Sequence, residues 1–493
     1  MLYPEWSVRS RAWTAPRQTM HNATNGSRRG PGARAQESAT RLSPWWSEPR
    51  VDTFMSLPTE SRISLGRAHV LTSSAIHQAA RAGIPATSLT PTGSVRRFAP
   101  DVGDVALLAA LASSHHADAL DRFASLPMVI GVLARSASTV GVLTVKGRAT
   151  FHVTAPDDLG AALVWYTGSR RHLDALRARA EVMDLDLDDG RLRRRGGPPV
   201  ATPSEEDVYR LLDLPYIPPE LREHGDEVAA AARGALPCLV SAAHIRGDLH
   251  MHTTWSDGRD TLDDMVRASQ SLGYDYVAIT DHSERAPSSR TLAAADVPRQ
   301  REAIDRLRET VPGLTLLHGV EVDIMRDGSL DFDDEQLSRF DVVLASLHDH
   351  AGQSGAALTH RYLRAIAHPL VNVITHPANR SPALSGGYDL DFDRIFAAAA
   401  ETGTALEIDG APGHLDMDGL IARRAVAAGA TVTIDSDSHR ADALIRQMQF
   451  GVGTARRGWL EPHHVLNARG VDEVRAFVAA KRAGRRPRRV EGP

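Results

Sequence analysis

Two histidines two residues apart, followed by an aspartate, form a compact group of potential metal ligands. The stretch Arg246-Gly-Asp-Leu-His-Met-His-Thr-Thr-Trp-Ser-Asp-Gly258 contains His250, His252 and, five residues further on, Asp257. Because side chains in a strand alternate between its two faces, both imidazoles project from the same face. Together with a carboxylate from the next turn they supply half of a divalent-metal site. A pair of surface histidines at a strand end is the alternative interpretation.

Regular alternation of strand-like and helical segments must position these residues. Strand-like runs fall at 246–250, 275–280, 314–321, 341–347, 371–375, 404–408 and 431–435. Helical segments between them are predicted at 260–272, 296–310, 333–339, 358–367, 390–402 and 416–428. Seven βα repeats with short connections predict a parallel α/β barrel.

Further imidazoles and carboxylates follow these strands, at His282, Glu321, His348, His376, Asp437 and His439. Barrel enzymes build their sites from the C-terminal ends of different strands, so all nine residues are expected to converge. Six imidazoles and three carboxylates without a thiolate suit Mn, Fe or Zn and disfavour Ca or Mg. Clustered divalent ions lower the pKa of a bound water toward ~7 and neutralise phosphate oxygens. Asp281, Asp435 and His350 are candidates for acid–base or positioning roles, with backbone capping as the alternative for both aspartates.

The nine residues match the polymerase-and-histidinol-phosphatase (PHP) domain residue by residue. Four further motifs resemble the version fused to bacterial family X DNA polymerases: Thr280-Asp-His-Ser, Glu321-Val-Asp-Ile, Asp327-Gly-Ser-Leu-Asp331 and Gly458-Trp-Leu. The resemblance covers most of 246–480. It implies a distorted (β/α)7 barrel that binds three divalent metal ions, typically Mn, Zn or Fe, with Glu321 as a bridging ligand.

The preceding part, 56–220, reads as an α/β module. Helices are predicted at 66–82, 157–165 and 170–183, and strands at 105–111, 128–133, 141–145 and 150–154. The motifs Gly93-Ser94-Val95-Arg96-Arg97, Tyr166-Thr167-Gly168-Ser169 and Leu214-Pro-Tyr-Ile-Pro-Pro-Glu220 resemble the palm and thumb of family X polymerases. The resemblance implies that Ser94, Arg96, Arg97, Tyr166 and Gly168 contact nucleotide or DNA phosphates. Ordinary turn and surface structure is the alternative.

This module departs from the family at its catalytic positions. The family palm holds two metal ions with three aspartates, whereas this chain has Asp104-Val105-Ala106 and, on the later strand, Thr150. One carboxylate cannot hold two cations at the ~3.5–4 Å spacing of in-line phosphoryl transfer. The palm is therefore predicted to be degenerate and without polymerase activity.

A second departure lies in the predicted barrel, after Glu407-Ile408. The family usually has Asn-x-Asn-Pro-x-Arg-Leu-Asp, and this chain has Asp409-Gly-Ala-Pro-Gly-His414-Leu-Asp416. Two amides and an arginine that could meet substrate phosphate are replaced. The metal-ligand set is unaffected, so the departure concerns substrate identity.

Composition sets the remaining expectations. The chain has 493 residues, a net charge of -4 and one cysteine, Cys238, which excludes a disulfide framework and a Cys-rich zinc finger. No apolar run approaches the ~20 residues that span a bilayer, so no membrane association and a cytoplasmic location are expected. Residues 1–55 are predicted to be a disordered leader, 221–245 a helical connector and 481–493 a basic tail, more often solvated than binding.

The leading functional hypothesis is a metal-dependent phosphoesterase that acts at DNA 3′ ends or gaps in DNA repair, as an exonuclease or end-cleaning enzyme. The first alternative is a phosphatase for a small phosphomonoester, similar to histidinol-phosphate phosphatases. The second is a non-enzymatic protein that binds DNA or nucleotides and has a structural metal site.

Overall fold

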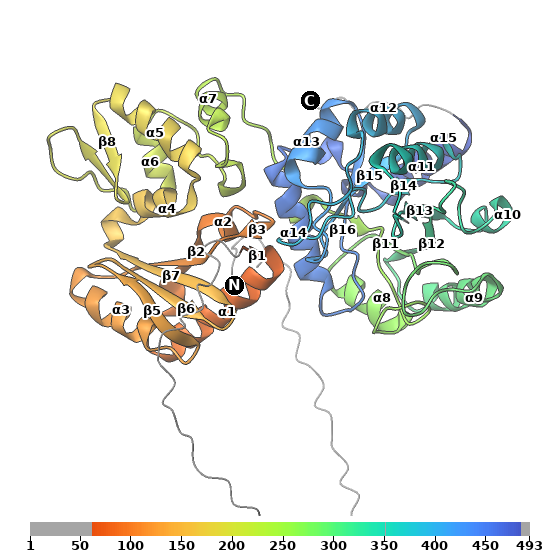
Figure 1. Ribbon diagram of the computed structural model, residues 1–493, viewed down its shortest axis with the longest axis horizontal. Coiled ribbons are helices and arrows are strands. Elements are labelled where there is room, and N and C mark those ends of the chain that lie inside the picture. The colour runs from red at the N-terminus through yellow and green to blue at the C-terminus, as the bar shows by residue number, and fades with distance from the viewer. Residues whose placement is uncertain (1–61, 351, 485–493) are drawn as a thin grey trace, which may run out of the picture.

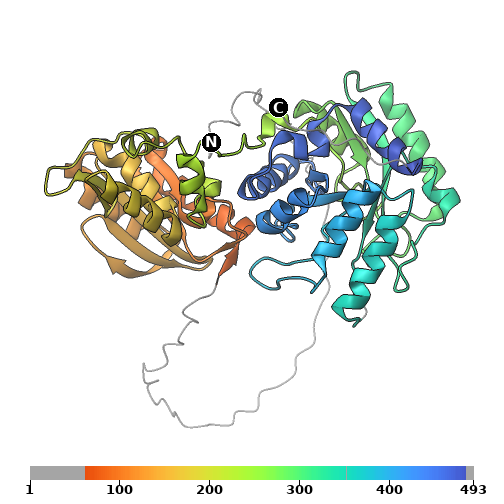
Figure 2. The same ribbon diagram turned by 90° about the horizontal axis from the view of Figure 1, so that it is seen from above.

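The computed structural model describes residues 62–350 and 352–484, which form two bodies side by side (Figures 1 and 2). The predicted leader, 1–55, lies outside the described residues. No helix within the described part of the chain is long and apolar enough to cross a membrane.

The first body begins with a five-stranded sheet. Its strands, in spatial order, are β2 (Leu89–Thr92), β4 (Val105–Ala110), β7 (Gly147–Thr154), β6 (Thr139–Thr144) and β5 (Val129–Arg135). Only β4 and β7 are parallel to each other. The helices α1 (Leu65–Arg81) and α3 (His116–Ala124) bury Ala75 and Leu120 in the sheet's core, where Phe123 stacks on Phe151. The predicted helix at 66–82 and the four predicted strands are confirmed within a few residues.

A helical subdomain follows the sheet. It consists of α4 (Leu159–Thr167), α5 (Arg170–Val182), the hairpin β8 (Leu185–Asp188) and β9 (Arg191–Arg194), α6 (Glu205–Leu211) and α7 (Asp226–Ala232). The predicted connector helix is α7, but it packs into this subdomain, because His172 Nδ1 lies 2.7 Å from the Glu227 carboxylate. Within 221–245, helix is therefore limited to α7, the 3-10 turn at Ala242–His244 and the end of the 3-10 turn Pro219–Leu221.

The second body is the predicted seven-stranded barrel. Its strands are β10 (Gly247–Asp248), β11 (Tyr276–Ile279), β12 (Thr315–Asp323), β13 (Val342–Ser346), β14 (Val373–Ile374), β15 (Ala405–Asp409) and β16 (Val432–Asp435), parallel and in sequence order. The ends of the sheet approach each other at a parallel bridge between Met251 and Ser438, where His252 N donates to Ser438 O at 2.9 Å. This contact nearly closes the barrel.

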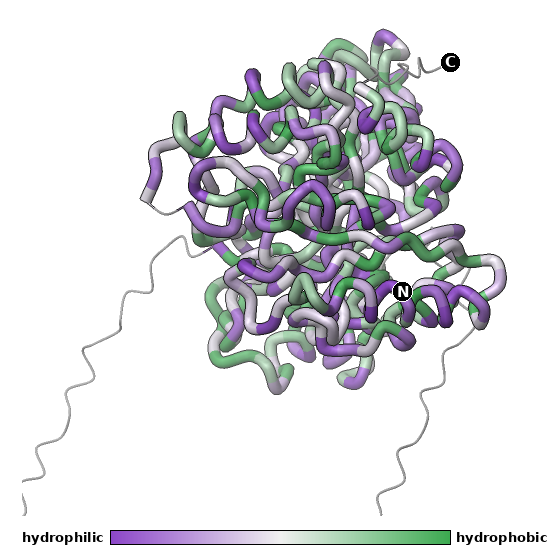
Figure 3. Tube along the Cα trace, turned by 90° about the vertical axis from the view of Figure 1, so that its right-hand side faces the viewer, coloured by the Kyte–Doolittle hydropathy of each residue, from purple (hydrophilic) through white to green (hydrophobic). Residues whose placement is uncertain are grey.

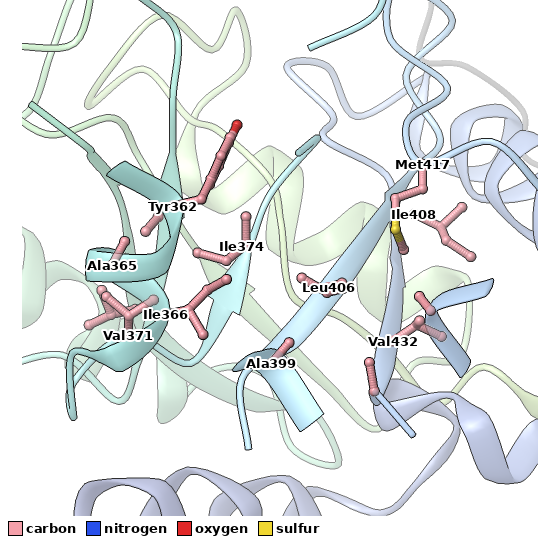
Figure 4. Packing of buried hydrophobic residues seen from close by; sticks show 14 of the residues in the cluster. Tyr362, Ala365, Ile366, Val371, Ile374, Ala399, Leu406, Ile408, Met417 and Val432 are labelled. Atoms are coloured by element: carbon pink, nitrogen blue, oxygen red, sulfur yellow. The ribbon is translucent and has the colours of Figure 1, made fainter. Parts of the chain in front are cut away.

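Helices surround the barrel on its outside. They are α8 (Leu262–Ser271), α9 (Val297–Arg308), α10 (Asp334–Leu337), α11 (Gly355–Ala367), α12 (Phe392–Thr402), α13 (Gly419–Ala427), α14 (Leu444–Arg457) and α15 (Val471–Arg482). Hydrophilic and hydrophobic residues alternate along the outer turns, as in helices that bury one face (Figure 3). Leu406 and Ile408 of β15 pack outward, among residues such as Tyr362 and Met417 (Figure 4).

The interior of the barrel is apolar at one end and polar at the other. Val342, Val373 and Ala405 pack with Phe477 of α15, which closes the N-terminal end of the strands. Because side chains alternate along a strand, Glu407 shares the inward face with Ala405 but lies nearer the C-terminal end. The helix α15 continues through Arg482, so Lys481, assigned to a tail from the sequence, is buried in the fold.

The two bodies meet along α14. Leu65 and Phe98 of the first body form one buried cluster with Leu415 and Phe450 of the second. The two bodies approach each other closely at Gly453, where an added Cβ would lie 2.1 Å from the Phe98 ring. Polar contacts continue the interface, with Arg457 donating to Arg97 O at 2.9 Å. The first body is therefore attached to the barrel by a packed surface as well as by the connecting chain.

Candidate metal centre

A cavity of about 230 Å³ opens at the C-terminal ends of the barrel strands. Seven of the nine predicted ligands line it: Asp257, His282, Glu321, His348, His376, Asp437 and His439. The other two, His250 and His252, are fully buried beside Glu321 and Asp437. The structure thus brings together all nine residues singled out in the sequence.

A first group of ligand atoms surrounds His250 and His252. Their Nε2 atoms lie 3.1 Å apart. His252 Nε2 is 3.1 Å from Asp437 Oδ1, and both rings lie within 3.5 Å of Glu321 Oε2. Behind His250, the Glu407 carboxylate lies 2.7 Å from Nδ1, which fixes the ring so that Nε2 faces the group.

A second group shares Glu321. Its other oxygen, Oε1, lies 3.1 Å from His376 Nε2 and 3.5 Å from His348 Nε2. Asp323 lies 3.2 Å behind His348 Nδ1 and orients that ring as Glu407 orients His250. Oε2 faces His250 and His252 and also His282, whose Nδ1 lies 2.8 Å away. Glu321 is therefore placed between groups of imidazoles, where a carboxylate could be shared by more than one cation.

A third group is closer to the mouth of the cavity. Asp257 Oδ1 lies 3.2 Å from His439 Nε2 and 3.7 Å from His282 Nε2. Ser288 Oγ donates to the other oxygen of Asp257 at 2.6 Å, which leaves Oδ1 directed at the two rings.

Two of the convergent residues have a left-handed backbone, with φ of 26° at His376 and 46° at Asp437. Such conformations cost about 1–3 kcal/mol in a residue other than glycine, and they cluster at functional sites.

The chemistry of the donor set fits divalent cations. Imidazole nitrogens and carboxylate oxygens converge, and buried atoms such as His252 Nδ1 and Glu321 Oε2 lack a hydrogen-bond partner. Buried polar atoms without partners are costly, and a cation satisfies several at once. The only cysteine of the chain, Cys238, is exposed and belongs to none of these groups. A set of imidazoles and carboxylates suits Mn, Fe or Zn.

The carboxylates also determine where protons reside in the metal-free protein. Burial opposes protonation of His348, but Glu321 and Asp323 outweigh it and raise its pKa to about 9. The pKa of His252 is lowered to about 3, by burial and then by the neighbouring His439 and His282. The cavity therefore contains protonated and neutral imidazoles at neutral pH before any metal binds.

The predicted acid candidates do not line the cavity. Asp281 is fully buried and accepts hydrogen bonds from Thr253, Ser256 and Gln300, so it orders the loop that carries His252 and Asp257. Asp435 accepts from Leu249 N at 2.7 Å and joins β16 to β10. Both aspartates therefore act on the main chain as positioning residues, as in the capping alternative. His350 lies outside the cavity lining, exposed near Tyr388.

Four functional side chains were missed as site residues: Glu407, Asp323, Asp409 and His414. Glu407 and Asp323 orient histidines, and their strand-end position in a buried run was the available signal. His414 lines the cavity and stacks on His376, with ring centroids 5.1 Å apart. It belongs to the segment that departs from the family pattern.

The predicted phosphate contacts of the first body are occupied within the protein. Arg96 forms a bidentate pair with Glu205 at 2.8 and 2.6 Å, and Arg97 contacts Glu223 at 2.8 Å. Gly168 packs on His172, whose Cδ2 lies 2.7 Å from an added Cβ, and Tyr166 stacks on His152 at 3.7 Å. Ser94 is half-buried in α2 (Gly93–Arg96). Phosphate binding by these residues stays a prediction, and their packing favours the structural alternative.

The two positions predicted to correspond to missing catalytic aspartates of the palm lie side by side. Ala106 of β4 and Thr150 of β7 are register partners on adjacent parallel strands. Thr150 Oγ1 donates to Asp104 Oδ2 at 3.0 Å. Among the described residues, no group of three metal-ligand side chains forms at this place.

Comparisons with known proteins define the class of both bodies. Residues 162–223 match the DNA polymerase beta thumb, and residues 248–405 match the PHP domain. The fold and the centre thus combine a polymerase-type thumb with a PHP barrel.

Individual relatives are consistent with this combination of domains. The chain is 33% identical to the DNA polymerase/3′-5′ exonuclease PolX of Bacillus subtilis over 390 residues, which cover 78% of this chain and 68% of that protein. It is 30% identical to a probable phosphatase of Syntrophotalea carbinolica, over 46% of this chain and 94% of that protein. A probable phosphatase of Shewanella oneidensis is 33% identical, over 40% of this chain and 77% of that protein. The chain therefore belongs to the bacterial family X DNA polymerases that carry a PHP domain, and its barrel is of the phosphoesterase type.

Proposed function

We propose that the chain hydrolyses phosphoester bonds at DNA 3′ ends and no longer adds nucleotides. The observation that supports this most strongly is the convergence of nine metal-ligand side chains at one cavity, while the palm has a single carboxylate. The PolX relative, named a DNA polymerase and 3′-5′ exonuclease, supports DNA as the substrate.

The residues of the barrel would hold the cations in three groups and orient the phosphate. Glu321 lies between the first two groups, and Asp257 with His282 and His439 forms the third. When bound, divalent ions supply a water of lowered pKa and neutralise phosphate oxygens. Glu407 and Asp323 hold their histidines in one tautomer, so the ligand nitrogens need no reorganisation.

The size of the cavity favours an end over an internal site. At about 230 Å³ it is smaller than the roughly 300–1,000 Å³ of typical ligand pockets. It would admit one terminal phosphoester with its sugar, and duplex DNA would have to lie outside it.

A small phosphomonoester is the second candidate substrate. Two relatives named probable phosphatases match 46% and 40% of this chain, which is close to the extent of the barrel alone. A barrel of this type is thus found in proteins whose similarity to this chain does not extend over the first body. A cavity of this size would also admit a small phosphate ester.

The experiment compares substrates on one preparation of the full chain. Labelled DNA with recessed or 3′-phosphorylated ends is assayed beside a panel of small phosphomonoesters, each with Mn²⁺ and with Zn²⁺. The proposal predicts a higher kcat/KM on DNA ends, and loss of this activity in His250→Ala. Turnover confined to small phosphomonoesters would support the second candidate, and equal activity of His250→Ala would contradict both.

A further inference from the structure

A fourth group of ligand atoms lies beside the three described above. Asp409 at the end of β15, His414 in the following loop and Asp437 offer one atom each, all within 4.8 Å of one another. Asp409 is fully buried, and its Oδ2 has no hydrogen-bond partner. Its Oδ1 accepts from Ala411 N at 2.5 Å, which fixes the carboxylate in place.

The protein around Asp409 leaves one of its carboxylate oxygens without a partner. Asp409 is the register partner of Asp435, and Glu407 is two residues away on the same strand. His414 Nδ1 is buried and also lacks a hydrogen-bond partner. A buried polar atom without a partner is costly, and a cation between Asp409 and Asp437 would satisfy the free oxygen of Asp409.

Asp437 has the capacity to serve two groups. Its Oδ1 lies 3.1 Å from His252 Nε2, in the first group. A carboxylate has a second oxygen, so it can bridge neighbouring cations, as the geometry around Glu321 already suggests. His414 is held on the cavity side by its stacking on His376, with an interplanar angle of 20°.

The residues at positions 409 and 414 both differ from the pattern that this segment resembles. The polymerase-fused pattern has an amide at 409 and a guanidinium at 414, and neither is a common ligand for Mn, Fe or Zn. This chain has a carboxylate and an imidazole instead.

We propose that Asp409, His414 and Asp437 form a fourth divalent-cation site, which shares Asp437 with the first group. Two carboxylate oxygens and one imidazole suit Mn, Fe or Zn. The site rests on the metal centre proposed above, and it adds one cation at the wall where a substrate phosphate would enter. The alternative is a proton held between Asp409 and His414.

Metal content and metal position test the site without any activity assay. Metal-free full chain is loaded with Mn²⁺ or Zn²⁺ and desalted, and the bound ions per chain are measured by elemental analysis. Crystals of the loaded protein are measured at the metal absorption edge. The variants are Asp409→Asn, which is nearly isosteric, and His414→Gln, with His115→Ala as a control that removes an exposed imidazole elsewhere.

The proposal predicts one ion fewer per chain in Asp409→Asn and in His414→Gln, and no change in His115→Ala. An anomalous peak should lie between Asp409, His414 and Asp437, and only this peak should disappear in the variants. Equal metal content, with no peak beside His414, would overturn the site even if DNA ends are hydrolysed. If one variant fails to fold, the other variant and the wild-type peak decide. A peak present without activity on DNA would contradict the proposed substrate and leave the site standing.

Discussion

Carboxylates behind the histidines are as important to this centre as the residues that face the cavity. Glu407 and Asp323 each contact the Nδ1 of one ligand histidine, so each sets which nitrogen is free to bind a cation. Glu407 also accepts from His376 N at 2.9 Å, which connects the first and second groups.

We therefore predict that Glu407→Gln lowers the affinity for Mn²⁺ or Zn²⁺ by about 10–100-fold, because the amide keeps the shape but loses the charge that orients His250. Competitive titration against a metal-binding dye measures the effect. Glu335→Gln, on an exposed helix end, is the matched control. Unchanged affinity would mean that Glu407 only joins β15 to its neighbours.

At the residue scale, the sequence predicted side chains whose position follows from the strand pattern. The nine convergent residues are the clearest case, because each of the later ones lies at the end of a predicted strand or within a few residues after it. The contacts of Arg96 and Arg97 were harder to predict, because their partners Glu205 and Glu223 lie 109 and 126 positions away in the sequence. His414 was also beyond reach, because its loop takes its shape from tertiary contacts.

At the scale of elements, the barrel strands were predictable and the last helices were not assigned. The hairpin of β8 and β9 was missed although a signal existed: Leu185, Leu187 and Leu192 alternate with charged residues around Asp189-Gly190. Lys481 was assigned to a basic tail, whereas α15 continues through Arg482. The Lys481 side chain is instead buried, and its Nζ donates to Ile366 O of α11 at 2.8 Å.

Lys481 should give the protein a distinctive pH dependence. Burial lowers its pKa to about 8. The unfolded chain, with a lysine pKa near 10.4, binds more protons between pH 8 and 10.4, so this residue's contribution to stability rises with pH by up to about 3 kcal/mol. Lys481→Met should remove that rise, as measured by urea unfolding at pH 7.5 and 10.

The control for this prediction is Lys146→Met, which changes the chain's other lysine, an exposed one. Its unfolding free energy should follow that of the wild type at both values of pH. Parallel pH curves for wild type and Lys481→Met would show that the ammonium group is not desolvated as the structure indicates.

At the scale of the whole molecule, the first body supports the loop that carries His414. Gly66 of α1 approaches Pro412 so closely that an added Cβ would lie 2.4 Å from the proline Cβ. Leu415 in the same loop packs with Leu65 and Phe98. Asp101 of the first body accepts from Ala383 N in the barrel. The first body thus supports one wall of the cavity.

This contact can be tested with a single methyl group. In a helix, alanine is favoured over glycine by about 1 kcal/mol, so Gly66→Ala would stabilise α1 in the absence of Pro412. Because of the clash we expect the loop to shift, with a lower melting temperature and a loss of about tenfold or more in hydrolysis. Gly103→Ala is the matched control, with no atom within 4 Å of the added Cβ. Equal melting temperatures and equal hydrolysis by Gly66→Ala and Gly103→Ala would show that the loop adapts to the added methyl group.

One paired assay most directly tests the proposal that the barrel hydrolyses DNA ends and that the palm adds no nucleotides. Wild type, Asp437→Ala and Asp104→Ala are incubated with a labelled primer–template, with and without deoxynucleotides, in Mn²⁺. We predict that wild type and Asp104→Ala shorten the primer equally, that Asp437→Ala does not shorten it, and that none extends it. Extension by wild type that disappears in Asp104→Ala would show that the palm is active and would contradict the account.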